Sequence, residues 1–429
     1  MRRTALFLLA ALALGGMACT HAQTTTITTG HALLATALPG PHVDGAISTR
    51  MVPALRDSVV TARLSIDSKI DASTPRPSLN VALCIDTSGS MEGKAIEDAR
   101  KAALSFLGGI KPGDGFSLVT FDSHARVVVP ATRMTDETDL ASIRKAISEI
   151  KATGTTAMAE GLTTAIAQVR QLYDATRVNR VVLVSDGVPN EGGALRTLVQ
   201  QAQQYGVSVS AMGLGVDYDE ILMGDLAQLG GGRFKYIDDS SKITAYLGDE
   251  LTRITRVSAR SASLEISPGP GVTVESVIGL QASPNGRGGV VVYLGDVSLG
   301  SHRDVFFRLR AHGRRDGAPV ELADATLRWV GTDGASHDEH FFYGAHATLD
   351  EDVLSKNRDD AVDKGAKDAQ AAADAIEAIR KAQQTDKTPP NTGRGGGGMM
   401  KPTQPAPMSS APDVTKRDHD RAMQTLYGE

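Results

Sequence analysis

The sequence has only two cysteines, no basic stripe and, beyond its N-terminus, no segment apolar enough to span a membrane. Removal or lipidation of Cys19 would leave Cys84 without a partner, so we expect no disulfide. Cys84 lies in an apolar run, where a free thiol behaves as a small buried hydrophobic group. The formal net charge of -5 argues against a nucleic-acid-binding protein, since no cluster of lysine and arginine could follow phosphates.

The N-terminus, MRRTALFLLAALALGGMACTHAQ, has the pattern of a secretory signal. Arg2 and Arg3 precede an apolar run that ends near Leu14, which is shorter than the roughly 20 residues that a bilayer requires. We expect a signal peptide over residues 1–22, and a competing lipoprotein cut would leave an acylated Cys19. The protein is therefore expected in the periplasm or cell envelope after export, either soluble or anchored through Cys19.

Residues 78–255 alternate between two kinds of apolar pattern. Short runs rich in β-branched residues, such as LNVALCID and RVVLVSD, are typical of strands, and segments such as KAIEDARKAALSFLGGI have helical spacing. Strands that alternate with helices predict an α/β domain with crossover connections. We expect a Rossmann-like, doubly wound and mostly parallel sheet with helices on both faces.

Residues 256–347 change to a period of two, with turns rich in Gly, Pro, Asn and Asp, which predicts an antiparallel β-sandwich. Residues 23–77 are expected to form a loose leader to about residue 45 and then the N-terminal strand or strands of the sandwich, including SVVTARLSID at 58–67. The α/β domain would then be inserted between sandwich strands.

The C-terminal part begins with an Ala-rich helical segment over residues 348–385. We expect one helix, or two broken near Gly365, with Asp350 as the N-cap. Residues 386–429 are rich in Pro and Gly and are expected to be a flexible, disordered tail that ends in a short helix.

Oxygen-bearing side chains follow two of the predicted parallel strands. Asp86, Ser88 and Ser90 come directly after NVALCI, and Asp186 ends RVVLVS. Between them, Thr155 and Thr156 lie in a loop before a helix. The carboxyl ends of parallel strands meet at one edge of a sheet, so these groups are expected to share a crevice. Carboxylates and hydroxyls without His or Cys favour Mg²⁺, Mn²⁺ or Ca²⁺ over zinc.

The same motifs resemble the von Willebrand factor type A (VWA) domain and its metal-ion-dependent adhesion site. The resemblance rests on DTSGS at 86–90, on Thr in TGTTAMAEGL, and on SDGVPN at 185–190, and it continues through 208–238. The spacing to Gly161 favours Thr156 over Thr155 as the ligand. Thr155 is a departure from the family pattern, because relatives often have Gly beside the key Thr.

By position, the resemblance implies that Ser88, Ser90 and Thr156 contact the metal directly. Asp86 and Asp186 would bind it directly or through water. The flanking segments resemble secreted bacterial proteins of the calcium-activated chloride-channel-like subgroup, a name that does not imply a channel. We therefore expect a non-enzymatic, divalent-cation-dependent adhesion or scaffold module, whose metal is completed by an Asp or Glu carboxylate of a protein partner.

Other interpretations of these residues are open at this stage. Residues 86–90 could cap the following helix. An acid protease requires Asp-Thr-Gly, but Ser88 separates Thr87 from Gly89. A hydrolase would require a nucleophile and a base, and no histidine lies in the crevice motifs. A structural scaffold with a vestigial metal site is the third alternative.

Three further features have simpler interpretations. The histidines of SHDEHFFYGAH lack zinc-site spacing and are expected to be exposed on a strand; they are His337, His340 and His346. Asp217 and Glu220 are expected to form a helix capping box. Asp122, which ends FSLVTF near the crevice, is either an acceptor behind the ligands or a turn aspartate.

Overall fold

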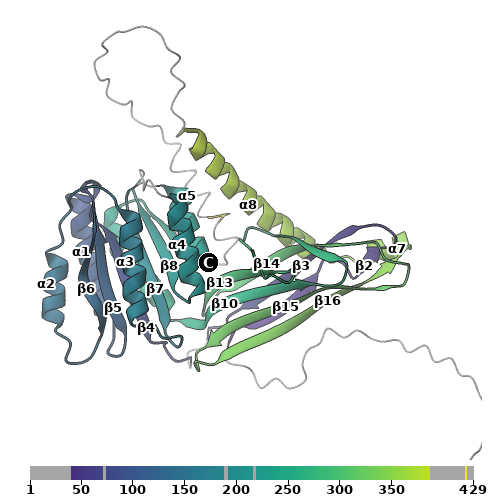
Figure 1. Cartoon of the computed structure of the whole chain (residues 1–429), viewed down its shortest axis with the longest axis horizontal. Helices are drawn as coiled ribbons and strands as arrows, with labels where there is room; N and C mark the ends of the chain where they lie inside the picture. Colours follow the sequence, from purple (N-terminus) through teal and green to yellow (C-terminus); the bar gives the residue numbers. More distant parts are fainter. Residues whose placement is uncertain (1–39, 71–73, 188–191, 216–218, 387–420, 423–429) are drawn as a thin grey trace, which may run out of the picture. The chain divides into compact units, whose positions relative to one another are not determined.

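The structure is a computed structural model that describes residues 40–70, 74–187, 192–215, 219–386 and 421–422 (Figure 1). The predicted signal peptide, Cys19, Asp217 and nearly all of the C-terminal tail lie outside the described residues. By their contacts, the described residues belong to one compact unit.

The α/β domain is built on a six-stranded sheet with the order β6-β5-β4-β7-β8-β9. Five strands run parallel and β6 is antiparallel to β5. The bounds are β4 Leu79–Asp86, β5 Gly115–Phe121, β6 Ala125–Arg133, β7 Val178–Ser185, β8 Ser208–Leu214 and β9 Gly231–Ile237. Every residue of β4, β5, β7 and β8 is buried, which explains their continuous apolar runs.

Helices cover both faces of this sheet, as the sequence predicts (Figure 1). Leu83 and Ile85 of β4 enter one apolar cluster with α1, α2 and α6, and Ala82 and Cys84 enter another with α3, α4 and α5. The helices are α1 Lys94–Gly108, α2 Leu140–Ser148, α3 Met158–Gln171, α4 Gly192–Gln204, α5 Glu220–Leu229 and α6 Ile243–Ile254, with short 3-10 turns η1 Gly89–Met91 and η2 Ser240–Lys242.

The second part is the expected sandwich, with sheet orders β1-β3-β14-β11 and β12-β13-β10-β15-β16-β2. Side chains from both sheets, such as Leu64, Phe307 and Leu327, form its core. The strands are β1 His42–Ile47, β2 Met51–Pro53, β3 Ser58–Asp67, β10 Val257–Pro268, β11 Val272–Val277, β12 Ser283–Pro284, β13 Val290–Ser298, β14 His302–Ala311, β15 Pro319–Gly331 and β16 Ser336–Thr348.

The α/β domain is inserted into this sandwich. β3 precedes the insertion and pairs with β14, which follows it in sequence. The two connections meet where the Ser68 hydroxyl donates to the Ser258 hydroxyl at 2.7 Å. The expectation of a loose leader to about residue 45 is wrong at its C-terminal end, because β1 begins at His42 and pairs with β3.

Two helices follow the sandwich, α7 Glu351–Lys356 and α8 Asp360–Asp386. Asp350 caps α7, as predicted, by accepting hydrogen bonds from the amides of Asp352 and Val353. The helices are not broken near Gly365. A Cβ on Gly365 would lie 2.6 Å from the Phe306 ring, so this glycine allows α8 to pack on the sandwich. No helix in the described part of the chain is both long and apolar enough to cross a membrane.

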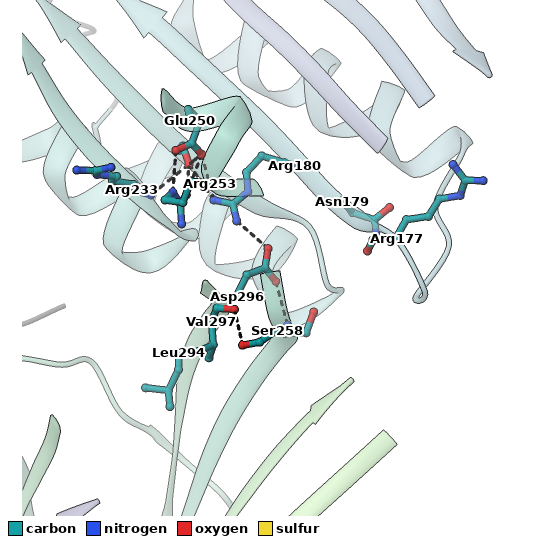
Figure 2. Close-up of polar contacts among 12 residues, drawn as sticks. Arg177, Asn179, Arg180, Arg233, Glu250, Arg253, Ser258, Leu294, Asp296 and Val297 are labelled. Carbon is teal, nitrogen blue, oxygen red and sulfur yellow. Dashed lines mark hydrogen bonds and ion pairs between the residues drawn. The ribbon is translucent and has the colours of Figure 1, made fainter. Parts of the chain in front are cut away.

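A buried ionic network joins the α/β domain to the sandwich. Figure 2 shows Arg180 of β7 between Glu250 of α6 and Asp296 of β13. Arg180 Nη2 lies 2.7 Å from Asp296 Oδ2, and its Nη1 donates to Ser210 Oγ at 2.8 Å. Ser210 in turn donates to Glu250 Oε1 at 2.6 Å. These bonds compensate for much of the cost of removing the charges from water.

Candidate metal site

The loop after β4 brings the first three predicted ligands together. The Ser88 amide donates to Asp86 Oδ1 at 2.8 Å, and the Ser88 and Ser90 hydroxyl oxygens lie 3.0 Å apart. Asp86 and Ser88 are buried, whereas Ser90 is exposed. Neither serine side chain caps a helix, since η1 has no side-chain cap and α1 begins after Gly93 without one. The helix-cap interpretation is therefore wrong.

The loop after β7 supplies the fourth residue. The Ser90 hydroxyl donates to Asp186 Oδ1 at 2.7 Å, which joins the two strand ends. The fully buried Ser185 hydroxyl donates to Asp86 Oδ2 at 2.5 Å and accepts from the Gly187 amide at 3.2 Å. Ser185 thus holds the Asp86 carboxylate against the loop that carries Asp186.

The loop before α3 places its two threonines differently. The Thr155 hydroxyl lies 3.2 Å from the Ser123 hydroxyl, away from Asp86. Thr156 instead lies beside Gly187: a Cβ built on Gly187 would be 2.9 Å from Thr156 Oγ1 and 3.3 Å from Asp86 Oδ2. The oxygens of Thr156 and Asp86 are therefore neighbours across a space that only a glycine at 187 leaves open.

The electrostatics of the site favour a cation. Burial raises the pKa of the Asp86 carboxyl; hydrogen bonds from Ser185 and Ser88 oppose this shift, and the charge of Asp186 adds to it. The two nearby carboxylates receive these hydrogen bonds from neutral amide and hydroxyl groups. The donors at hand, carboxylate and hydroxyl oxygens, are those of a hard divalent ion such as Mg²⁺, so the residues fit such an ion.

The histidines of β16 form no metal centre. No group of three or more His, Cys, Asp or Glu side chains suited to a metal occurs in the part of the chain that the structure describes. His340 is exposed and pairs with Asp338. The expectation of exposure is wrong for His337 and His346, which are both half-buried. The His337 ring stacks on Trp329 and contacts Asp333, which leaves its side chain 12% exposed.

Sequence reasoning missed two residues that shape the site, Ser185 and Gly187. Both belong to the quoted SDG motif, but their roles depend on where β4 and the loop before α3 lie in space. The sequence alone left the role of Asp122 open. The structure shows Asp122 buried at the end of β5, where it accepts hydrogen bonds from Arg126 and Thr153.

Comparisons with known proteins identify the family of the α/β domain. Residues 80–249 match the family described as von Willebrand factor type A domain. YfbK of Escherichia coli is 28% identical over 267 residues, which cover 59% of this chain and 45% of YfbK. Inter alpha-trypsin inhibitor, heavy chain 4, of Mus musculus is 26% identical over 230 residues, covering 52% of this chain and 24% of the relative. The matches thus span less than half the length of these relatives.

Two solved structures share the fold over most of the chain. A von Willebrand factor type A protein from Catenulispora acidiphila has a TM-score of 0.67 at 17% identity, covering 82% of this chain and 83% of its own. The ArnB paralog VWA2 from Sulfolobus acidocaldarius has a TM-score of 0.60 at 17% identity, covering 90% and 98%. The likeness therefore extends beyond the α/β domain. The chain contains a VWA domain.

Proposed function

We propose that the VWA domain of this chain binds a divalent cation and uses it to hold a protein partner. Ser88, Ser90 and Thr156 provide hydroxyl ligands, and Asp86 and Asp186 bind the ion directly or through water. Mg²⁺ is the preferred candidate, with Mn²⁺ and Ca²⁺ as alternatives. The observation that carries the proposal is the convergence of three loops, in which Ser90 reaches Asp186 at 2.7 Å and Thr156 lies next to Asp86 across Gly187.

A metal held in this way would act as a binding device. Two carboxylates nearly neutralise a divalent ion, and neutral hydroxyl ligands leave it attractive to one more anionic oxygen. An Asp or Glu side chain of a partner protein supplies that oxygen. We propose that the chain is an adhesion or scaffold module of the cell envelope, that it belongs to the calcium-activated chloride-channel-like subgroup, and that Cys19 is a site of lipid anchoring.

A hydrolase is the alternative from a different class. It would need a poised serine and a general base. The Ser90 hydroxyl donates to the Asp186 carboxylate, and the imidazole of His124 contacts Glu160 and not a serine. We favour a non-enzymatic role because Ser88, Ser90 and Asp186 are all required as ligands of the proposed metal. A further alternative is a structural scaffold with a vestigial metal site, which predicts no metal-dependent binding of a partner.

Calorimetric titration with Mg²⁺ tests the metal site. We expect wild-type protein to bind Mg²⁺ and Asp86→Asn to lose most of that affinity, because a buried charged acceptor becomes neutral. Asp136→Asn, a change at an exposed carboxyl between β6 and α2, is the matched control and should bind normally. Equal affinities for Asp86→Asn and wild type would reject the site.

Capture of proteins from an envelope extract tests the partner. The immobilised protein is incubated with the extract in Mg²⁺ or in EDTA, and the bound proteins are compared. Metal-bridged binding predicts proteins that are retained with Mg²⁺, are released by EDTA and are absent with the Asp86→Asn variant. The same bound set under all three conditions would contradict it.

A further inference from the structure

The loop that carries Thr156 is held on one side by the loop after β4. The Thr153 amide donates to the Thr87 carbonyl at 2.7 Å, and the Gly89 amide donates to the Gly154 carbonyl at 3.1 Å. These two bonds set how far the threonine loop lies from residues 86–90. They involve backbone atoms only, and Gly154 is required among them, because its φ is +72° and a Cβ there would lie 2.5 Å from Ser123 Oγ.

On its other side the loop is held by the end of β5, through side chains. The Thr153 hydroxyl donates to Asp122 Oδ2 at 2.8 Å, and the Thr155 amide donates to the Ser123 hydroxyl at 3.1 Å. The Ala157 amide also donates to the Asp122 carbonyl at 2.6 Å. Asp122 therefore contacts the loop both before and after Thr156.

Asp122 is itself fixed in place. It is 1% exposed, and its carboxylate accepts from Arg126 Nη1 at 2.5 Å and from the His124 amide at 3.1 Å. Burial opposes its ionisation, but the hydrogen bonds from Arg126 and Thr153 hold its pKa below the ordinary value. A buried carboxylate anchored by its own hairpin is a rigid support for a neighbouring loop.

This support leaves one hydroxyl of the loop available. Thr153 and Thr155 both use their hydroxyls, toward Asp122 and Ser123. Among the described residues, the Thr156 hydroxyl makes no hydrogen bond, and Thr156 Oγ1 and Cγ2 both lie 2.9 Å from a Cβ built on Gly187, beside Asp86. Anchoring the residues on both sides of Thr156 thus fixes the backbone from which this side chain reaches the site.

We propose that Asp122 is a positioning residue of the metal site, which fixes the Thr156 hydroxyl through Thr153 and thereby favours Mg²⁺ over Ca²⁺. The inference rests on the proposed function. Mg²⁺ requires near-ideal octahedral geometry at about 2.0–2.1 Å, whereas Ca²⁺ accepts flexible geometry at about 2.3–2.6 Å. A loosened Thr156 loop therefore costs Mg²⁺ binding more than Ca²⁺ binding.

The test compares Mg²⁺ and Ca²⁺ affinities of threonine variants by calorimetry. Thr153→Val removes the hydroxyl that reaches Asp122 and keeps the side-chain shape. We expect its Mg²⁺ affinity to fall about tenfold, as is usual when a residue behind a metal ligand is lost, and its Ca²⁺ affinity to fall less. Thr153→Ser keeps the hydroxyl and should bind like wild type.

Two comparisons separate positioning from general destabilisation. Thr163→Val removes a hydroxyl on α3 that donates to the Ala159 carbonyl, and it should change neither affinity. Asp122→Ala should lower the Mg²⁺ affinity, and adding Thr153→Val to it should cost little more, because each change removes the hydrogen bond between these two side chains. Unfolding temperatures measured in EDTA identify any variant that fails to fold. If Asp122→Ala fails to fold, the test rests on Thr153→Val, which changes an exposed position.

The outcomes are distinct. A wild-type protein that binds Mg²⁺ and a folded Thr153→Val variant that binds it equally well would overturn the role of Asp122 and leave the metal site intact. Equal losses of Mg²⁺ and Ca²⁺ affinity would also overturn it, since the threonine loop would then not favour the ion with the stricter coordination geometry. A wild-type protein that binds neither ion would reject the proposed function and this inference with it.

Discussion

Arg180 and Asp296 form an ion pair of 2.7 Å across the junction of the VWA domain and the sandwich, with side chains that are 0% and 4% exposed. Removing Asp296 leaves the buried Arg180 without its closest carboxylate, and only Ser210 and the more distant Glu250 then compensate its charge. We expect Asp296→Ala to lower the free energy of unfolding by about 3–5 kcal/mol, as measured by urea titration. Glu351→Ala breaks the exposed pair with Arg56 and should cost at most about 1 kcal/mol. A similar small loss for both variants would contradict this prediction.

Glu250 should make stability depend on pH. Burial raises the pKa of its carboxyl, but the charges of Arg253 and Arg180 outweigh this and lower the pKa to about 2 from 4.5. Because the folded value is the lower one, the stabilisation is complete above the unfolded value and is lost as pH falls from about 4.5 toward 2. Urea titrations should therefore show Glu250→Gln well below wild type at pH 6, with the gap narrowing below about pH 4.5. A difference in unfolding free energy between wild type and Glu250→Gln that stays constant on acidification would contradict this prediction.

Gly187→Ala should damage the metal site without unfolding the domain. The new Cβ would lie 2.9 Å from Thr156 Oγ1 and 3.3 Å from Asp86 Oδ2, so the ligands must separate. We expect the Mg²⁺ affinity to fall at least about tenfold, in line with losses of supporting contacts around metals. Gly193→Ala is the control, since a Cβ there meets no atom within 4 Å. Unchanged Mg²⁺ binding by Gly187→Ala would show that the ion lies elsewhere.

Mg²⁺ should stabilise the folded protein through Asp186. A ligand that binds only the folded state adds about 2.7 kcal/mol when its concentration is 100 times the dissociation constant. Thermal unfolding should therefore shift upward with Mg²⁺ and return with EDTA, and Asp186→Asn should show little of this shift. An equal shift in the variant would mean that Mg²⁺ acts at another place.

Much of the fold could be predicted because burial on both faces of the parallel sheet requires continuous apolar strands. β4 and β7 are such strands, and they also mark the strand ends where Asp86 and Asp186 lie. The antiparallel β6 was not predicted, because its half-exposed edge position gives a weaker pattern that includes Pro130. The break between α7 and α8 depends instead on local capping by Asp359, which accepts from the Ala361 and Val362 amides.

The oxygen donors of the site could be predicted from the sequence, whereas the residues that hold these donors in place could not. Asp86, Ser88 and Ser90 are close in sequence, so their shared role can be recognised there. Ser185 and Asp122 act on partners 99 and 31 residues away, and only the folded chain brings these pairs together. His337 was misjudged for the same reason, since Trp329 covers it from the neighbouring strand β15.

The insertion also determines how the protein would respond to mechanical force. Both connections of the VWA domain join the sandwich side by side, at Ser68 and Ser258. Tension between β1 and α8 therefore passes through the sandwich strands and bypasses the VWA domain. A pull on a partner at the crevice must instead leave through the two connections and through contacts between the two parts, such as Arg180–Asp296 and Gln228–Gly279. Tension along the chain therefore does not pass through the crevice, which keeps its geometry when the chain is stretched.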